Sequence, residues 1–413
     1  MEYSMTTVIW VLVGAALVYF MQAGFALCEA GLTRAKNTGN ILMKNMMDFC
    51  IGTPCFWLVG FGLMFGGTGA IIGHLDPMIL GSYTAENSVV PQTMPLWAYV
   101  IFQTVFCATA ATIVSGSMAE RTNFKAYCVY SAVISLIVYP ISGHWIWGGG
   151  WLSTLGFHDF AGSTCVHMVG GLIACLGAWM LGPRIGKYDK NGKARAIPGH
   201  NMSLAVIGLF VLWLGWFGFN GGSSLGANVQ AVKAFLNTNT ACATAMIVWV
   251  LFDCLRGHKP SAMGAAVGAV IGLVAITPSA GWVSVGQSIC IAVLTTSVCY
   301  IAVHWKNKTS VDDALDVFPT HGVGGIFGTV LTGIFVYETT EITYFQSFIH
   351  HILALVIVCG YTFVVTFLLY WITNKMIPFR VSEENETIGL DKSQHDEIYG
   401  MGMFFDDEAK DSN

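Results

Sequence analysis

The chain has 413 residues, of which 54% are hydrophobic and only 10% are charged. A soluble domain carries about 25% charged residues, so the composition excludes a soluble protein and indicates a polytopic membrane protein. The formal net charge of −5 says little, because the position of each charge along the chain matters more.

Eleven apolar stretches each approach the roughly 20 residues that a helix needs to cross a bilayer. The first follows M-E-Y-S-M-T-T, which lacks a positive n-region, and its apolar run is too long for a signal peptide, so we expect it to remain as a span. The predicted spans are 5–27, 42–66, 96–118, 126–148, 162–182, 201–222, 232–254, 261–278, 282–304, 319–337 and 346–374.

The basic residues lie in the odd-numbered loops and after the last span, and only Lys233 falls on the opposite side. By the positive-inside rule, the odd loops and the C-terminus are cytoplasmic and the N-terminus is outside. This alternation also supports an odd number of spans.

The first ten spans divide into two halves of five, at about 5–182 and 201–337. An odd number of spans in each half predicts inverted repeats related by a pseudo-twofold axis in the membrane plane. The stretch 346–374 is then an extra helix. We therefore predict an all-α fold with a transmembrane domain at 1–380. The polar, acidic tail 381–413 is predicted to be cytoplasmic and either mobile or ordered by a partner.

Two similar motifs place a histidine early in spans five and ten. They read D-F-A-G-S-T-C-V-H-M-V-G-G from Asp159 and D-V-F-P-T-H-G-V-G-G from Asp316, and both contain H-x-V-G-G. Ionisable groups are costly in a bilayer and indicate function by default. Two unrelated, satisfied histidines would leave the matched motifs unexplained, so we interpret His167 and His321 as a functional pair where the halves meet.

Two neutral imidazoles can share one hydrogen bond, with one nitrogen donating and the other accepting. Such a pair can accept a proton, pass it on and bind a small neutral polar molecule. Each histidine nevertheless lies roughly 25 Å from the far end of its span at 1.5 Å per residue. The pairing therefore requires strong helix tilt or recessed helix starts.

Asp159 and Asp316 precede these histidines by eight and five residues. A carboxylate near a helix N-terminus caps backbone N–H groups and complements the helix dipole, so a structural role is favoured over ligand contact for both. Asp159 can in addition attract a cation to the outer mouth.

Aromatic residues form a further constellation. Each one alone is more simply explained by packing or by an interfacial belt. Together with the two histidines, they predict an aromatic cation site above a narrow apolar gate, since aromatic faces attract cations by roughly 0.5–2 kcal/mol. The candidates are Phe102 and Phe106 at i,i+4 in span three, Trp145 and Trp147 at the end of span four, and Trp216, Phe219, Asn220 and Ser223 at the end of span six.

The motifs W-G-G-G, D-F-A-G-x-x-x-V-H, W-F-G-F-N-x-G-S, A-E-R and D-V-F-x-x-H-G-V resemble the ammonium transporter family (Amt/Mep/Rh), most closely its Amt branch. The similarity runs from G-L-x-R-x-K-N at Gly31 to G-L-D at Gly389. It implies an eleven-helix fold in the cell membrane, a homotrimer and one pore through each subunit.

The resemblance also implies roles for individual residues. It implies an outer cation site at Trp147, Phe106 and Ser223, with Asp159 at its base. A stacked gate of Phe106 and Phe219 follows, and then the His167–His321 pair. The tail up to Tyr399 resembles the family tail that meets the subunit core and PII-type signal proteins, whereas the residues after Tyr399 match no family pattern.

A bare charge at the bilayer centre costs from about 3 to more than 10 kcal/mol. We therefore expect ammonium to be collected as a cation, to lose its proton near Phe106 and Phe219, and to cross along the histidines as ammonia. Potassium has no proton to give, so deprotonation discriminates against it. Whether the proton crosses separately stays open at this point.

Two alternatives are a channel of the Rh type for neutral molecules and an ammonium sensor that signals through the tail. The aromatic cation site favours the cation-collecting branch over the neutral channel. An enzyme has little support, because no G-x-G-x-x-G, G-x-x-x-x-G-K or H-E-x-x-H stands in a suitable context. No motif predicts a cofactor, a metal or nucleic-acid binding, and the twelve cysteines lack zinc-site spacing.

Overall fold

The computed structural model describes residues 3–84, 86–336 and 342–399. Within this part of the chain every regular element is helical, and only two isolated β-bridges occur, Thr122 with Arg380 and Tyr188 with Ala194. The all-α prediction is thereby confirmed. The segment after Tyr399, for which the sequence showed no family pattern, lies outside the described residues.

Nine helices of the described chain are long and apolar enough to cross a membrane. Each coincides with one of the predicted spans, although the ends differ by several residues. They are α1 (Met5–Leu32), η1–α2–η2–α3 (Ala35–Phe65), α4 (Leu96–Ser117), α5–η3–α6 (Phe124–Ile146) with the short α7 (Trp151–Thr154), η4–α8 (Ser163–Leu181), α9 (Met202–Gly222), α10 (Val229–Leu255), α12 (Val285–Lys306) and α14 (Tyr344–Met376).

The other two predicted spans coincide with shorter helices. The stretch 261–278 forms α11 (Ala262–Ile276), and the stretch 319–337 forms a π-helical turn, η5 (Phe318–Val323), that continues as α13 (Gly324–Phe335). Both are apolar but have fewer regular turns than their neighbours. After α14, the tail forms two single-turn helices, α15 (Glu383–Ile388) and α16 (Leu390–His395).

Capping residues fix where many of these helices begin. The side chains of Asn201, Asn228 and Ser261 each accept a hydrogen bond from a backbone N–H in the first turn of α9, α10 or α11. Ser284 and Gln287 form a reciprocal capping box at the start of α12. These caps explain helix boundaries that hydropathy alone leaves uncertain.

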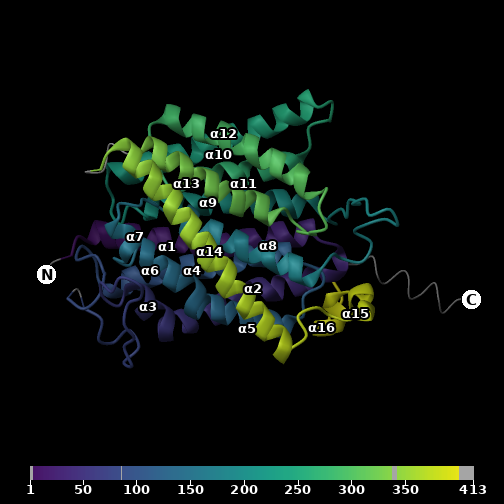
Figure 1. Cartoon of the computed structure of the whole chain (residues 1–413), viewed down its shortest axis with the longest axis horizontal. Coiled ribbons are helices and arrows are strands. Elements are labelled where there is room, and N and C mark those ends of the chain that lie inside the picture. Colours follow the sequence, from purple (N-terminus) through teal and green to yellow (C-terminus); the bar gives the residue numbers. More distant parts are fainter. Residues whose placement is uncertain (1–2, 85, 337–341, 400–413) are drawn as a thin grey trace, which may run out of the picture.

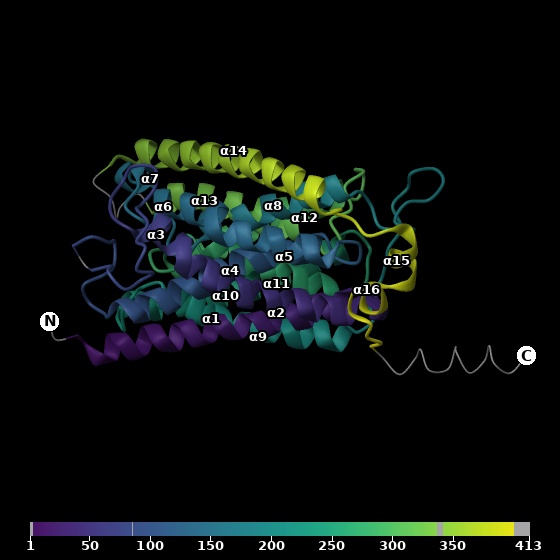
Figure 2. The same cartoon turned by 90° about the horizontal axis from the view of Figure 1, so that it is seen from below.

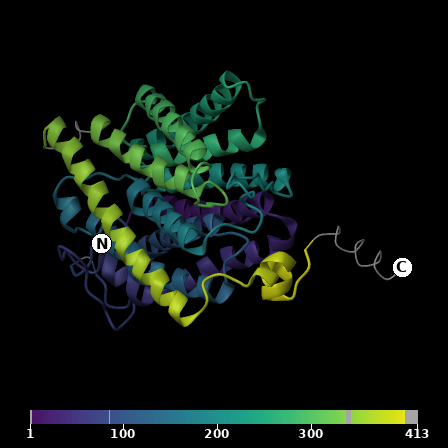
Figure 3. The same cartoon turned by 45° about the vertical axis from the view of Figure 1, so that its right-hand side comes forward.

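The helices lie side by side in one bundle, and α14 runs obliquely across its outside (Figures 1 and 3). Helix α1 begins at one end of the bundle, and α15 and α16 lie at the other (Figure 2). In the apolar 18-residue stretch of each helix, 94% of α4 is buried but only 33% of α14. The bundle therefore surrounds α4, and α14 exposes a broad apolar face.

Small residues let the two halves of the chain approach closely. Helix α1 packs along α9, and a Cβ atom built on Gly208 would lie 2.6 Å from the backbone nitrogen of Cys28. A Cβ built on Gly24 would lie 2.9 Å from the nitrogen of Leu212. Backbones this close exclude any larger side chain, which is typical of helix pairs in membranes.

Candidate functional site

Both candidate histidines lie in π-helical turns that begin after non-helical chain. His167 is in η4 (Ser163–Met168) and His321 is in η5. Gly162, just before η4, has φ +109°, which a residue with a side chain rarely adopts. π-Helical turns are frequent at functional sites. Both helices start late, so neither histidine follows several turns of helix. Recessed helix starts are one of the two conditions under which the sequence allowed the histidines to pair.

Asp159 caps the first of these helix starts. Its two carboxylate oxygens accept hydrogen bonds of 2.8–3.0 Å from the backbone N–H groups of Gly162, Ser163, Thr164 and Cys165. Burial raises the pKa of the Asp159 carboxyl, and these four donors oppose that rise. The carboxylate thus holds the turn that presents His167.

The second helix start is capped by Asp313 and not by Asp316. Asp313 accepts from the N–H groups of Val317 at 3.0 Å and Phe318 at 2.7 Å, whereas the Asp316 carboxylate forms a short ion pair with Lys306. This corrects the capping role that the sequence suggested for Asp316. Asp313 precedes His321 by eight residues, as Asp159 precedes His167, so the matching interval was the usable signal.

The glycines of the two H-x-V-G-G motifs let the broken helices cross. A Cβ built on Gly171 would lie 2.3 Å from the backbone nitrogen of Gly322. A Cβ built on Gly325 would lie 2.6 Å from the carbonyl oxygen of Ser163. Each motif therefore packs its second glycine against the π-helical turn of the other, and this reciprocal contact brings the two imidazoles together.

The imidazoles of His167 and His321 face each other through their Nδ1 atoms, which are 3.2 Å apart. His167 also stacks on Trp216, with ring centroids 5.0 Å apart and planes 15° from parallel. Trp216 in turn donates from Nε1 to Thr277 Oγ1 at 2.9 Å. The buried Nε2 of His167 has no partner in the described chain, so it is available to a small polar molecule.

Aromatic rings continue from the imidazoles toward the N-terminal end of the bundle. His167 and Phe219 have centroids 5.4 Å apart, and Phe219 stacks on Phe106 at 4.2 Å. Phe106 then meets Trp147 edge to face at 6.0 Å. Phe102 lies 4.8 Å from Phe106 on the same helix face. These rings form one continuous file that ends at a cavity.

This outer cavity has a volume of about 150 Å³. Trp147 is fixed there by a 2.7 Å hydrogen bond from Nε1 to the Asp159 carbonyl oxygen, and Ser223 donates to the Phe219 carbonyl at 2.8 Å. Sequence reasoning identified four of its lining residues, Phe102, Phe106, Trp147 and Ser223, and missed the other four, Tyr99, Gln103, Phe160 and Leu225.

Two of the remaining candidates do not line the outer cavity. Asn220 is buried and donates from Nδ2 to Thr238 Oγ1 at 2.8 Å. Trp145 donates to the Ile71 carbonyl at 2.8 Å and does not line the outer cavity. Of the missed residues, Gln103 carried a usable signal, because it is a polar side chain within an apolar span, one residue after Phe102.

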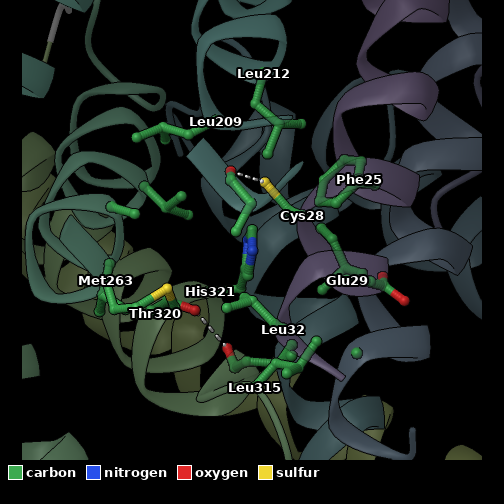
Figure 4. Close-up of a pocket in the computed structure, with 17 residues that line it drawn as sticks. Phe25, Cys28, Glu29, Leu32, Leu209, Leu212, Met263, Leu315, Thr320 and His321 are labelled. Carbon is green, nitrogen blue, oxygen red and sulfur yellow. Dashed lines mark hydrogen bonds between the residues drawn. The ribbon is translucent and has the colours of Figure 1, made fainter. Parts of the chain in front are cut away.

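A second cavity lies beyond the histidine pair, on the side of the tail. It has a volume of about 90 Å³ and is lined mostly by apolar side chains, together with Glu29, Thr320 and His321. Figure 4 shows the His321 ring at its centre, with Phe25 and Glu29 of α1 on one side and Met263 on the other. The imidazole pair thus separates two cavities.

The tail docks against the loops at the same end of the bundle. Glu386 accepts from the backbone N–H of Ile185 and from Arg380. Asp391 accepts from the N–H of Asn40 at 2.8 Å, and Asn40 also contacts His395 at 2.9 Å. These contacts join the tail to the start of α2 and to the loop after α8.

The described residues contain no group of three or more His, Cys, Asp or Glu side chains that could hold a metal ion. All twelve cysteines are free thiols. The site is therefore built from imidazole, aromatic, hydroxyl and carboxyl groups.

A bundle of apolar helices around two cavities, joined by a file of aromatic and imidazole rings, defines a multi-pass membrane protein that moves a small solute. Residues 9–399 match the family model described as Ammonium Transporter Family. The chain belongs to this family of transmembrane ammonium transporters.

Individual relatives agree with this assignment. The chain is 44% identical to the ammonium transporter Amt2 of Archaeoglobus fulgidus, over 94% of this chain and 86% of the relative. It is 36% identical to an ammonium transporter of Bacillus subtilis, over 93% and 95%.

Solved structures are similar as well. A structure titled Sensor Amt Protein has a TM-score of 0.90 at 35% identity, covering 94% of this chain and 98% of that one. Mep2 of Candida albicans has a TM-score of 0.86 at 30% identity, covering 93% and 88%.

Proposed function

We propose that the chain collects ammonium at the outer cavity, removes its proton there and passes ammonia along the histidine pair. The observation that carries this proposal is the continuous file from Trp147 through Phe106 and Phe219 to His167 and His321. In this file, Trp147, Phe106 and Ser223 bind the cation, and Asp159 supports Trp147 through its backbone carbonyl.

The stacked Phe106 and Phe219 rings act as the gate. Their faces leave no polar partner for an ion, so an ammonium ion must give up either its hydration or its charge to pass. The proton passes to water in the outer cavity, and neutral ammonia then crosses the apolar gate at a far lower desolvation cost than the cation would. The neutral product then meets the unpartnered Nε2 of His167, which can accept from or donate to ammonia.

Electrophysiology and flux measurements on the purified protein in liposomes test this proposal together. We expect an ammonium gradient to drive ammonia into the liposomes. A measurable current accompanies this flux if the proton crosses by a separate path. Ammonia flux with no current at any ammonium concentration would favour the Rh-type alternative. Failure to move either species would overturn the proposal.

The sensor alternative has one specific support, the similarity to the structure titled Sensor Amt Protein. A sensor signals through its tail, and the tail here docks on the loops at one end of the bundle. Ammonium that changes tail contacts without crossing the membrane would favour this reading. A pull-down with and without residues 381–413 tests whether the tail recruits a regulator, for which a PII-type signal protein is the candidate.

We further propose that α11 and η5–α13 also cross the membrane, giving eleven spans in two inverted halves, about 5–182 and 201–337, with α14 as the extra helix. The reciprocal glycine contacts and the paired eight-residue intervals from Asp159 and Asp313 support the two-half arrangement. The basic loops favour a cell-membrane orientation with the tail of 381–413 in the cytoplasm. The homotrimer stays a proposal from the family resemblance, and native mass spectrometry checks it.

A further inference from the structure

A buried polar cluster lies beside the inner cavity and takes no part in the transport path described above. It contains three ionisable side chains, Glu29 in the last turn of α1 and Lys44 and Asp48 in α2, each at most 5% exposed. Charged groups are rarely placed inside a membrane bundle without a functional reason.

Hydrogen bonds hold each member of this cluster in place. Glu29 Oε2 accepts from Ser115 Oγ at 2.7 Å and from Asn45 Nδ2 at 3.3 Å. Lys44 Nζ donates to the Ser115 carbonyl at 3.1 Å and lies 5.1 Å from the centre of the Tyr127 ring. The hydroxyls of Tyr127 and Ser131 donate to the two oxygens of Asp48.

The charges of the cluster do not balance. Two carboxylates and one ammonium would leave one excess negative charge when all three are ionised. No described ion pair joins Lys44 to either acid. The nearest other charges are Glu120, which is already paired with Arg34 and Arg184, and Arg121, whose guanidinium donates only to backbone carbonyls.

Arg121 therefore offsets the excess charge only from a distance. An uncompensated buried charge is costly, so one proton bound by the two carboxylates is favourable. Because Lys44 and the donors from Ser115, Tyr127 and Ser131 partly stabilise the ionised carboxylates, that proton is also able to leave. Coupled carboxylates of this kind titrate as a unit.

Glu29 connects the cluster to the pore. It lines the inner cavity together with His321 and Cys28, and Figure 4 shows its carboxylate turned away from the imidazole. No described hydrogen bond reaches its second oxygen, Oε1, because both protein donors bind Oε2. Oε1 nevertheless keeps a small accessible surface in this buried residue, so water in the cavity can reach it and exchange a proton with it.

We propose that Glu29 is the proton-exchanging residue of the inner cavity, and that Lys44 and Asp48 set its charge. This rests on the proposed function, in which ammonium loses its proton at the outer side. A proton that arrives on the imidazole pair leaves a nitrogen of His321, passes through cavity water and forms an O–H bond at Glu29. The imidazole becomes neutral again, and the carboxyl later releases the same proton to water at the tail end of the bundle.

The first test compares the parent with Glu29→Gln in liposomes. Glutamine can keep the bonds from Ser115 and Asn45 but cannot carry the proton. We expect the ammonium-driven current to fall by about tenfold or more, as for loss of a positioned proton-transfer group, while ammonia flux persists. Asp48→Asn tests the charge-setting part of the proposal, because this carboxyl lies in the same cluster but does not line the cavity. Removal of its charge should shift the pH profile of the current, whereas an unchanged pH profile would overturn the role of Asp48.

Infrared difference spectroscopy provides a second readout that a purely structural role would not change. The parent should show a protonated-carboxyl band that titrates with pH and is lost in Glu29→Gln. Glu29→Asp keeps the carboxyl and should retain both the band and part of the current, which covers the case in which glutamine does not fold.

The outcomes separate the two proposals. A parent without transport would overturn the proposed function, and the infrared band would still decide whether Glu29 exchanges a proton. A working parent whose current and band are both unchanged in Glu29→Gln would overturn the role of Glu29.

Discussion

Phe106 and Phe219 close the path between the outer cavity and the histidines with two nearly parallel rings. In Phe106→Ala we expect water to enter the space between the outer cavity and the histidines, so that potassium competes with ammonium. The truncation should also lower stability by about 3–5 kcal/mol. The measurement is the ammonium current in liposomes with and without added potassium.

Phe61→Ala is the matched control for this change, because Phe61 is an equally buried ring that packs against Phe56, Phe65 and Tyr83. It should lose comparable stability and keep the selectivity of the parent. If Phe106→Ala conducts like the parent, the gate assignment is wrong.

His167 contributes an imidazole that is neutral when it shares a hydrogen bond with His321. His167→Asp would place a carboxylate at the same point of the path and stabilise a cation there. We expect the ammonium-over-potassium selectivity to fall, measured as the ratio of currents at equal concentration. Unchanged selectivity in a normally folded variant would contradict the role of the histidine.

At the residue scale, the sequence predicted the histidine pair and half of the outer cavity. Repetition of H-x-V-G-G could be recognised without a structure. The stack of His167 on Trp216 could not, because it depends on how η4 and α9 are rotated against each other. The prediction that Asp316 caps the second helix was wrong because it also depended on local geometry. The backbone at Asp316 has φ +57°, and its side chain pairs with Lys306.

At the scale of the elements, the crossing of η4–α8 and η5–α13 depends on glycine. Gly171→Ala would place a Cβ 2.3 Å from the Gly322 nitrogen, a backbone atom that cannot move alone. We expect the two helices to separate, the imidazole contact to lengthen and stability to fall by about 1–3 kcal/mol, as for overpacked cores. Ammonium flux and thermal unfolding in detergent check this result.

Gly324→Ala provides the comparison within the partner motif. A Cβ at Gly324 would lie 3.4 Å from the Val274 side chain and 3.7 Å from Cys299 Sγ, which are ordinary contacts. This variant should transport like the parent, and equal losses in both variants would show that the crossing is not specific to Gly171.

Hydropathy predicted the long helices well because each is apolar over most of its length. It could not predict that spans five and ten begin with π-helical turns, since these depend on the caps from Asp159 and Asp313. Hydropathy also predicted α11 and α13 as full-length spans like the longer helices, because composition does not report where a helix ends.

At the scale of the whole molecule, an ion network ties both halves of the chain together at the tail end. Arg184, after α8, binds the Asp312 carboxylate at 2.8 Å and Glu120 at 3.1 Å. Glu120 also binds Arg34, which follows α1. The network thus joins the ends of α1, α4 and α8 to the segment before η5.

This network makes stability depend on pH in the acid range. Burial alone would raise the pKa of Asp312, but the hydrogen bonds and charge of Arg184 outweigh it and hold that pKa well below its usual range. Glu120 is shifted in the same direction by Arg34 and Arg184, also against burial. A depressed folded-state pKa stabilises the protein above the unfolded value, near 4. We therefore expect the unfolding temperature to stay level at neutral pH and to fall as the pH drops below about 5.

Asp312→Asn tests the assignment, because it leaves the buried Arg184 without its main partner. It should cost about 3–5 kcal/mol at neutral pH and flatten the acid dependence. Asp396→Asn is the control, since Asp396 is exposed and pairs only with Lys392, so its unfolding curve should match the parent. An acid profile that is as steep in Asp312→Asn as in the parent would place the responsible carboxyl elsewhere, because the coupling between the two halves would then not depend on the Arg184 pair.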